Sequence, residues 1–187
     1  LIPAETPTHL NTPNLDTLAA TSRAIYQGQA LEISYRSLSS GRSTREIVPF
    51  ALVDNGLRWH VRAYDRKRSH FGDFVVNRME RAKVVAGDVD GSETKEADNQ
   101  WNRIVELHIA PHPRLDHPKT IEAEYAMSDG LLKSNVRAAV AGYVLRRWNV
   151  DCTEEASLAG AEYQLYLRNR QSLYGTENLA IAPGNKA

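Results

Sequence analysis

Residues 58–64 (RWHVRAY) alternate between apolar and polar side chains in a way that favours an anion-binding surface. Side chains of a β-strand point alternately to opposite faces of a sheet. The two sets are Trp59, Val61 and Ala63 on one face, and Arg58, His60, Arg62 and Tyr64 on the other. We expect the first set to pack a core and the second to line a surface. A row of these polar types suits an anionic ligand better than catalysis.

Arg62 and His60 are the strongest site candidates within this row. A guanidinium presents a fixed fork of donors that matches phosphate or carboxylate. A neutral imidazole can donate or accept, and it becomes cationic if a phosphate raises its pKa. The alternative is that both residues are solvated positions on an exposed strand. If Arg62 binds the ligand, Arg62→Ala is expected to abolish the ligand response and to change stability by no more than about 0.5 kcal/mol. Trp59→Ala should instead cost roughly 3–5 kcal/mol through loss of core packing.

Other polar residues could complete the site. The loop 38–44 contains four Ser or Thr and Gly41, which supply phosphate donors, although a plain hairpin loop has the same composition. Arg78 could reach the ligand or a carboxylate such as Glu80, and Tyr64 could stack on a base or simply be exposed. Tyr35 alternates in step with Leu31 and Ile33 and is therefore expected on the same, core-facing side of its strand. The predicted ligand-binding set is Arg36, Ser37, Ser39, His60, Arg62, Tyr64, Asn77 and Arg78.

Other chemistries find little support. His108, His112 and His117 lack the carboxylate or Cys spacing of a zinc set, so we expect no metal. Cys152 has no basic cluster nearby that would lower its pKa. Phosphate-loop, dinucleotide and nucleophile-elbow motifs are absent from the sequence. We therefore predict a protein that is not an enzyme and has no cofactor.

Composition indicates a cytoplasmic globular protein. The 187 residues are 42% hydrophobic and 25% charged, with one Cys, which fits a reducing compartment. No stretch is apolar enough for a membrane span, and the start is not a signal peptide. The sequence does not begin with Met, and we expect a fragment of a longer protein.

The net charge of zero hides an asymmetry. Residues 28–86 carry eleven Lys and Arg against six Asp and Glu, a net charge of +5, whereas residues 87–187 carry eleven against fifteen. An anionic partner would be drawn to the first half, although an excess of this size also serves solubility alone.

The pattern predicts an α+β protein. Thr12 and Pro13 are expected to open a helix whose apolar face includes Leu15 and Leu18, and Gly28 is expected to end it. Strands are predicted over 31–37, 45–53, 57–65, 71–77 and 83–86, with a tight turn at 54–56 and an edge position or a bend at Pro49. Residues 88–100 are predicted as a solvated linker. Beyond them, strands are expected near 104–110, 131–136 and 163–167, and helices over 118–125 and 137–148.

Four blocks in the first half carry a family resemblance. They are ISYRS (33–37), REIVP (45–49), RWHVRAYD (58–65) and residues 71–78. Their order and spacing resemble the WYL domain, a ligand-sensing module of bacterial transcription regulators. Residues 101–173 resemble the C-terminal extension called WCX. The pairing is similar to regulators associated with phage defence.

The resemblance implies a small Sm-like or SH3-like β-barrel at 28–87, after an N-terminal linker and helix at 1–27. It also implies an α+β dimerisation domain at 101–187 and a winged helix-turn-helix before Leu1. The chain would then sense a nucleotide, cyclic oligonucleotide or single-stranded nucleic acid as part of a homodimeric repressor. That repressor would reach operator DNA through the domain before Leu1. The competing hypotheses are a β-barrel that binds RNA or single-stranded DNA without a switch, and a purely structural dimerisation module.

Overall fold

The computed structural model describes residues 2–5 and 10–185. The chain divides into two compact units, Leu1–Asp98 (unit 1) and Asn99–Ala187 (unit 2). Each unit combines helices with an antiparallel or mixed sheet, which confirms the predicted α+β class. No helix within the described residues is long and apolar enough to cross a membrane.

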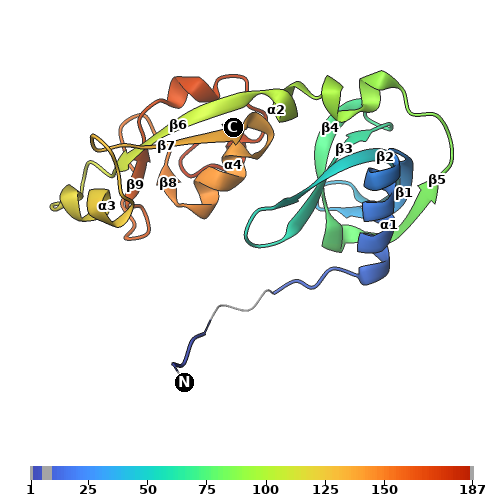
Figure 1. The fold of residues 1–187 in the computed structure, drawn as a ribbon, viewed down its shortest axis with the longest axis horizontal. Helices are drawn as coiled ribbons and strands as arrows, with labels where there is room; N and C mark the ends of the chain where they lie inside the picture. Colours follow the sequence, from blue (N-terminus) through green and yellow to red (C-terminus); the bar gives the residue numbers. More distant parts are fainter. Residues whose placement is uncertain (1, 6–9, 186–187) are drawn as a thin grey trace. The chain divides into compact units, whose positions relative to one another are not determined.

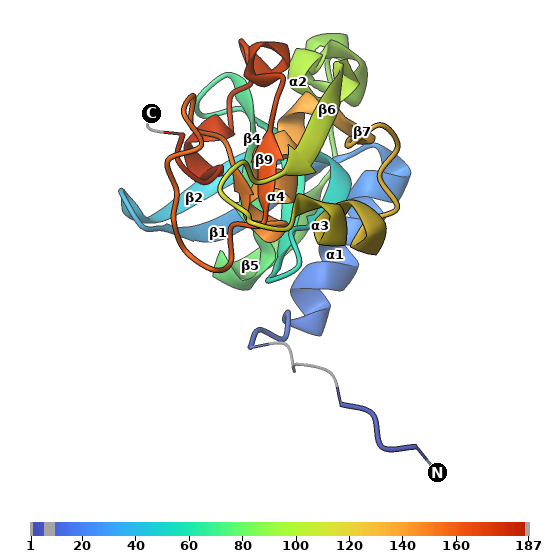
Figure 2. The same ribbon diagram turned by 90° about the vertical axis from the view of Figure 1, so that its left-hand side faces the viewer.

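Unit 1 is a five-stranded antiparallel sheet with one helix packed on it (Figure 1). Its elements are α1 (Leu15–Gln27), β1 (Ala30–Ser37), β2 (Gly41–Asp54), β3 (Trp59–Asp65), β4 (His70–Val75), the 3-10 turn η1 (Val76–Arg78) and β5 (Met79–Val85). The strands lie in the order β4-β3-β2-β1-β5, so each of the five predicted strands is present. Figure 2 shows the β1–β2 hairpin projecting from the sheet. Closure of this sheet into a barrel remains a prediction.

Helix α1 starts two residues later than expected and buries a different face. Asn14 rather than Thr12 is the N-cap, and its Oδ1 accepts a hydrogen bond from the Thr17 backbone N–H at 3.0 Å. The helix ends as predicted at Gly28, which adopts φ +62°. The buried residues are Thr17, Ala20, Thr21 and Ala24. The small side chains on this face let the helix approach the sheet closely. Leu15 lies on another face of the helix and is 75% exposed.

Two local features of the sheet agree with the sequence. Asp54 Oδ1 accepts from the Gly56 backbone N–H at 2.8 Å, and Gly56 takes φ +83°, so the predicted tight turn forms. Pro49 lies in β2, an inner strand, at a shift in the β2–β3 register. Of the two alternatives for Pro49, the bend is therefore confirmed and the edge position is wrong.

The core of unit 1 lies between α1 and the sheet. Leu31, Ile33, Ile47 and Val61 are fully buried there, and Ala24 of α1 packs against them. Tyr35 is also buried, as predicted, and its hydroxyl accepts from the Val75 backbone N–H at 3.2 Å. These contacts fix the strands that carry the candidate site.

Residues 88–100, predicted as a solvated linker, are mostly exposed but contain short regular turns and one buried residue. They contain two short 3-10 turns, η2 (Gly91–Glu93) and η3 (Lys95–Ala97). Arg66 of unit 1 donates to both carboxylate oxygens of Glu93, at 2.7 and 2.6 Å. Asp98 is 1% exposed. The segment is held to the sheet by charged side chains. The sequence prediction of a linker relied on the lack of large apolar residues, which gives no information about ion pairs.

Unit 2 is a four-stranded sheet in the order β7-β6-β9-β8, with α4 packed against it (Figures 1 and 2). Its elements are α2 (Asn99–Asn102), β6 (Ile104–Pro111), α3 (Pro118–Glu124), β7 (Leu132–Arg137), α4 (Ala138–Arg147), β8 (Val150–Asp151), β9 (Leu165–Leu167), η4 (Arg170–Leu173) and η5 (Leu179–Ile181). Leu107, Ile109, Leu145 and Leu167 form its fully buried centre. The sequence missed β8, which is only two residues long.

Candidate anion-binding site

Strand β3 presents its polar residues differently from the prediction. His60 and Arg62, expected on an open surface, are each 4% exposed, whereas Trp59, expected in the core, is 40% exposed. The reason is that β3 is an inner strand between β2 and β4 and is covered on both faces. Val61 and Ala63 face the core, and the polar face is covered by carboxylates. The open cationic row predicted on β3 is therefore wrong in this structure.

Arg62 is held by two aspartates. Its Nε donates to Asp98 Oδ2 at 2.8 Å and its Nη2 to Asp98 Oδ1 at 3.2 Å, which makes a two-pronged pair. Its Nη1 donates to Asp73 Oδ1 at 3.3 Å. Burial by itself would lower the pKa of Arg62, but the hydrogen bond and charge of Asp98 together with Asp73 outweigh burial and raise it. The guanidinium is thus charged, and carboxylates already occupy its fork.

His60 lies beside this cluster in neutral form. Burial lowers its pKa most, and the nearby charges of Arg58 and Arg78 lower it further, against the opposing effect of Asp73. An imidazole whose pKa is below the ordinary value of about 6.5 carries little charge at pH 7. His60 therefore contributes a neutral polar group rather than a cation.

A pocket at the turn end of the β1–β2 hairpin gathers three of the predicted residues. This hairpin pocket, of about 340 Å³, is lined by Arg36, Ser37, Leu38, Gly41, Arg42 and Arg78. Arg42 was not in the predicted set. It lies directly across the ladder from Arg36, so the pairing of the hairpin strands was the signal that could have found it.

Glu80 partly neutralises the hairpin pocket. Arg36 pairs with its carboxylate, and Arg42 Nε lies 2.8 Å from Glu80 Oε2. The hydrogen bond from Arg36 is the main cause of a lowered pKa at Glu80, with the charges of Arg36 and Arg42 adding to it. The side chains of Arg36 and Arg42 are 67% and 58% exposed. Both guanidinium groups therefore remain largely open to solvent while they pair with Glu80.

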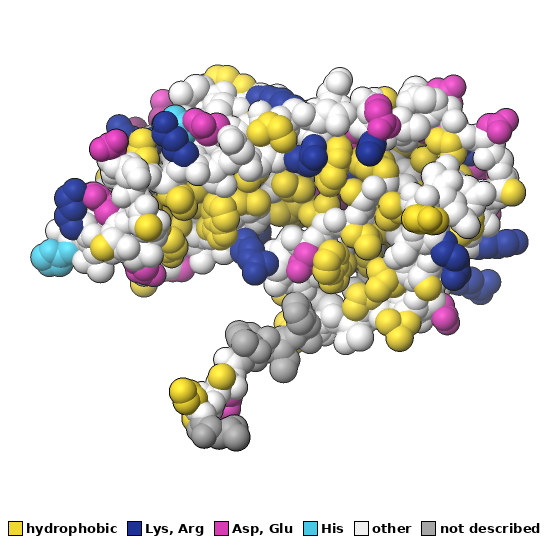
Figure 3. Space-filling model, in the orientation of Figure 1, with side chains coloured by type: hydrophobic (Ala, Val, Ile, Leu, Met, Phe, Trp, Pro, Cys, Tyr) yellow, Lys and Arg dark blue, Asp and Glu magenta, His cyan; other side chains and the backbone are white. Residues whose placement is uncertain are grey.

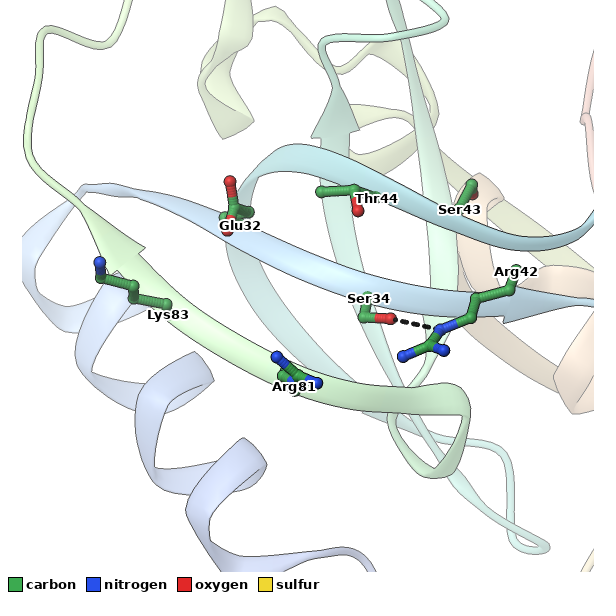
Figure 4. Close-up of a pocket in the computed structure, with 7 residues that line it drawn as sticks. All are labelled: Glu32, Ser34, Arg42, Ser43, Thr44, Arg81 and Lys83. Atoms are coloured by element: carbon green, nitrogen blue, oxygen red, sulfur yellow. Dashed lines mark hydrogen bonds between the residues drawn. The ribbon is translucent and has the colours of Figure 1, made fainter.

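A second hollow, the strand groove, adjoins the hairpin pocket through Arg42 (Figure 4). It has a volume of about 510 Å³ and is lined by Glu32, Ser34, Arg42, Ser43, Thr44, Arg81 and Lys83. Arg42 Nε donates to Ser34 Oγ at 3.2 Å. Arg81 and Lys83 of β5 lie opposite Ser34 and Glu32 in the β1–β5 ladder. The two hollows together present five cations on one side of unit 1.

The remaining predicted residues lie outside both hollows. Tyr64 is half-buried and packs edge-on against Phe71, with ring centroids 5.1 Å apart. Asn77 donates to the Thr12 carbonyl at 3.0 Å. Ser39 lies in the hairpin turn, where its hydroxyl is 3.1 Å from that of Ser37.

The geometry offers little for other chemistries. Among residues 2–5 and 10–185, no three His, Cys, Asp or Glu side chains are grouped to hold a metal. Burial raises the pKa of the Cys152 thiol to about 12, so the reactive thiolate is scarce at neutral pH.

Comparison with known families assigns both units. The family model of the WYL domain matches residues 16–84, and that of the BrxR transcriptional regulator C-terminal dimerization domain matches residues 104–173. The chain therefore belongs to the WYL-domain family, which confirms the resemblance drawn from the four sequence blocks. Its second unit matches the BrxR-type C-terminal dimerization domain, over the region where the sequence resembled a C-terminal extension.

Named relatives agree with this assignment. The chain is 32% identical over 174 residues to the DNA-binding transcriptional repressor CapW of Escherichia coli (strain KTE188), covering 91% of this chain and 57% of the relative. It is 34% identical over 163 residues to CapW of Pseudomonas aeruginosa, covering 86% and 53%. The chain thus spans just over half the length of these relatives. The structure of proteasome accessory factor B/C of Arthrobacter aurescens aligns with a TM-score of 0.41 and 20% identity, covering 85% of this chain and 25% of that one.

Proposed function

We propose that this chain is the effector-sensing and dimerising part of a bacterial transcriptional repressor. The effector is an anion, either a nucleotide, a cyclic oligonucleotide or a single-stranded nucleic acid, and it binds in the hairpin pocket. The observation that carries the proposal is the convergence of Arg36, Arg42 and Arg78 on one pocket of the WYL domain. A DNA-reading domain joined to the chain contacts the operator, in keeping with the DNA-binding repressor relatives.

The pocket supplies what a phosphate requires. Two exposed guanidinium forks can each engage two oxygens of one phosphate group. Gly41, with φ +67°, makes the tight turn beside them. A phosphate that enters takes the place of the Glu80 carboxylate. Binding then favours one arrangement of the dimer over another, because the effector interacts differently with the two.

Binding of labelled oligonucleotides and unlabelled nucleotides tests the proposal. We expect Arg36→Ala and Arg42→Ala each to weaken binding at least about tenfold and to reduce the slope of log affinity against log salt by about one. Arg23→Ala is the matched control, since it removes the same charge from an exposed position on α1. Binding that is unaffected by both pocket substitutions would overturn the site. Salt-independent affinity would indicate a neutral ligand.

A second candidate function is direct binding of single-stranded nucleic acid without a switch. The strand groove favours it, because Arg42 on β2 and Arg81 and Lys83 on β5 lie on either side of β1. Cations spaced along a groove in this way can contact successive phosphates of a single strand. Operator binding by the full-length regulator, measured with and without the effector, distinguishes the two functions. Under the first, the effector changes the affinity of the full-length regulator for its operator, and under the second it leaves that affinity unchanged.

A further inference from the structure

The buried ion pair of Arg62 and Asp98 joins a strand of the sheet to a segment outside the sheet. Arg62 belongs to the inner strand β3, whereas Asp98 is the last residue of unit 1 and follows the turn η3. Both are almost fully buried, at 4% and 1% exposure. A buried arginine needs an anion to offset the loss of water, and Asp98 supplies that anion from 36 residues away.

The segment that carries Asp98 is held to the sheet by ion pairs rather than by apolar burial. The turns η2 and η3 have no buried residues. The contacts that hold the segment include Arg66 with Glu93 and Arg62 with Asp98. Arg45 and Asp65 form a comparable buried pair, but both belong to paired strands whose ladder fixes them in place. A carboxylate on a charge-anchored segment can be exchanged, because a competing anion offers the arginine the same hydrogen bonds.

We propose that Arg62, with His60 beside it on β3, is a second anion-binding site that Asp98 fills from within. Its ligand is a carboxylate or phosphate that presents two oxygens to the Nε and Nη2 donors now engaged by Asp98. This proposal is independent of the hairpin pocket, since it requires only that the Asp98 carboxylate be replaceable.

Replacement of Asp98 has a consequence at the boundary of the two units. Asn99, the first residue of unit 2, follows Asp98 directly. An anion that takes the arginine releases the end of unit 1 and loosens the segment that leads into the dimerization domain. If the effector of the proposed function reaches Arg62, the loosening of this segment would transmit effector binding to the dimerization domain. Only this transmission rests on the proposed function; the anion site at Arg62 does not.

Chemical rescue tests the proposal without any effector. In the whole chain, Asp98→Ala should lower the melting temperature by roughly 6–20 °C, the usual effect of a buried charge left without its partner. Sodium formate, which restores the missing carboxylate, should then raise it by about 3 °C or more beyond an equal concentration of sodium chloride. Wild-type protein should show no such difference. The double variant Arg62→Met, Asp98→Ala should also show none, because the cation that binds formate is gone.

Two further measurements decide the outcome. Glu93→Ala, which cuts the other, partly buried anchor of the same segment, should show no formate-specific recovery. Hydrogen exchange of the backbone amides of residues 97 and 98 should become faster in Asp98→Ala than in wild type. It should stay fast with formate, because formate fills the site without tethering the segment. If Asp98→Ala does not fold, Asp98→Ser takes its place, because it also removes the carboxylate and leaves room for formate. An unchanged melting temperature, or a loss that formate does not repair, would overturn the proposal.

Discussion

The Arg62 side chain donates hydrogen bonds to two buried or nearly buried carboxylates, and its truncation removes the cation that both share. We expect Arg62→Ala to destabilise the protein by about 3–5 kcal/mol, rather than by the 0.5 kcal/mol of a solvent-facing position. Arg66→Ala, which cuts a more exposed pair, should cost about 1 kcal/mol or less. Urea unfolding of both variants provides the measurement. Equal, small losses would show that the Arg62 cluster contributes nothing to stability.

Prediction of residue positions from the sequence failed where a distant residue decides the environment. The alternation in residues 58–64 correctly indicated a strand and placed Val61 and Ala63 in the core. It could not indicate that Asp98 would cover the other face, because a local period contains no information about a contact 36 residues away. Trp59, predicted in the core, is 40% exposed, so we expect Trp59→Ala to cost less than the roughly 3–5 kcal/mol of a fully buried aromatic residue.

The buried Asp151 predicts a pH dependence of stability. Burial would raise its pKa, but hydrogen bonds from the Thr153 backbone and hydroxyl, the Leu158 backbone and His112 outweigh burial and lower it. A carboxyl whose folded pKa lies below its unfolded value of about 3.9 stabilises the fold above that pH. The stabilisation is lost as the pH falls through the lower, folded pKa.

The test compares unfolding free energies between pH 7 and about pH 2. Asp151→Asn should reduce the slope in the acid range, because its side chain does not titrate. Asp116→Asn, at an exposed position, should retain the wild-type slope. An unchanged acid slope in Asp151→Asn would contradict the assignment of this carboxyl.

At the scale of elements, α4 and the turn η5 meet at a glycine. A Cβ added to Gly142 would lie 2.2 Å from the Asn178 carbonyl oxygen and 2.8 Å from Ile181 Cγ1. Ala normally stabilises a helix interior by about 1 kcal/mol relative to Gly. Here overpacking costs about 1–3 kcal/mol or more, and the Asn178 bond to the Ala139 carbonyl would be disturbed. We expect Gly142→Ala to lower stability despite its higher helix propensity.

Thermal unfolding of two glycine variants checks this expectation. Gly91→Ala is the control, because nothing lies within 4 Å of its added Cβ and its φ is not positive. It should be neutral within about 0.5 kcal/mol. A Gly142→Ala protein as stable as wild type would show that η5 moves away from α4 without cost.

Elements with strong local signals were predictable, and those defined by packing were not. The five strands of unit 1 follow from their β-branched and aromatic residues, and α3 starts at Pro118 as the sequence indicated. The buried face of α1 consists of Ala and Thr, which hydrophobic periodicity does not distinguish from solvent-facing positions. Strand β8 has two residues and exists only because β9 lies beside it in parallel.

At the scale of the whole molecule, unit 2 leaves apolar surface for a second copy. Helix α4 buries Ala138, Ala141 and Leu145, whereas Trp148 is 38% exposed beside Tyr125, also 38% exposed. Both aromatic residues line a hollow of about 530 Å³ with Leu132 and Leu165. In Figure 3 hydrophobic side chains gather over the part of unit 2 where α4 and β8 lie. This surface belongs to the unit that matches a dimerization domain.

We therefore expect the chain to be a homodimer through this surface. A two-fold dimer repeats one patch on both copies, so a charge placed there repels its symmetry mate or is buried unpaired. Trp148→Glu should give a folded monomer by light scattering, with an unchanged circular dichroism spectrum. Tyr174→Glu changes an aromatic residue that is 77% exposed outside the hollow, and it should remain dimeric. A dimeric Trp148→Glu protein would place the interface elsewhere, and a monomeric wild-type chain would refute self-association of this part of the regulator.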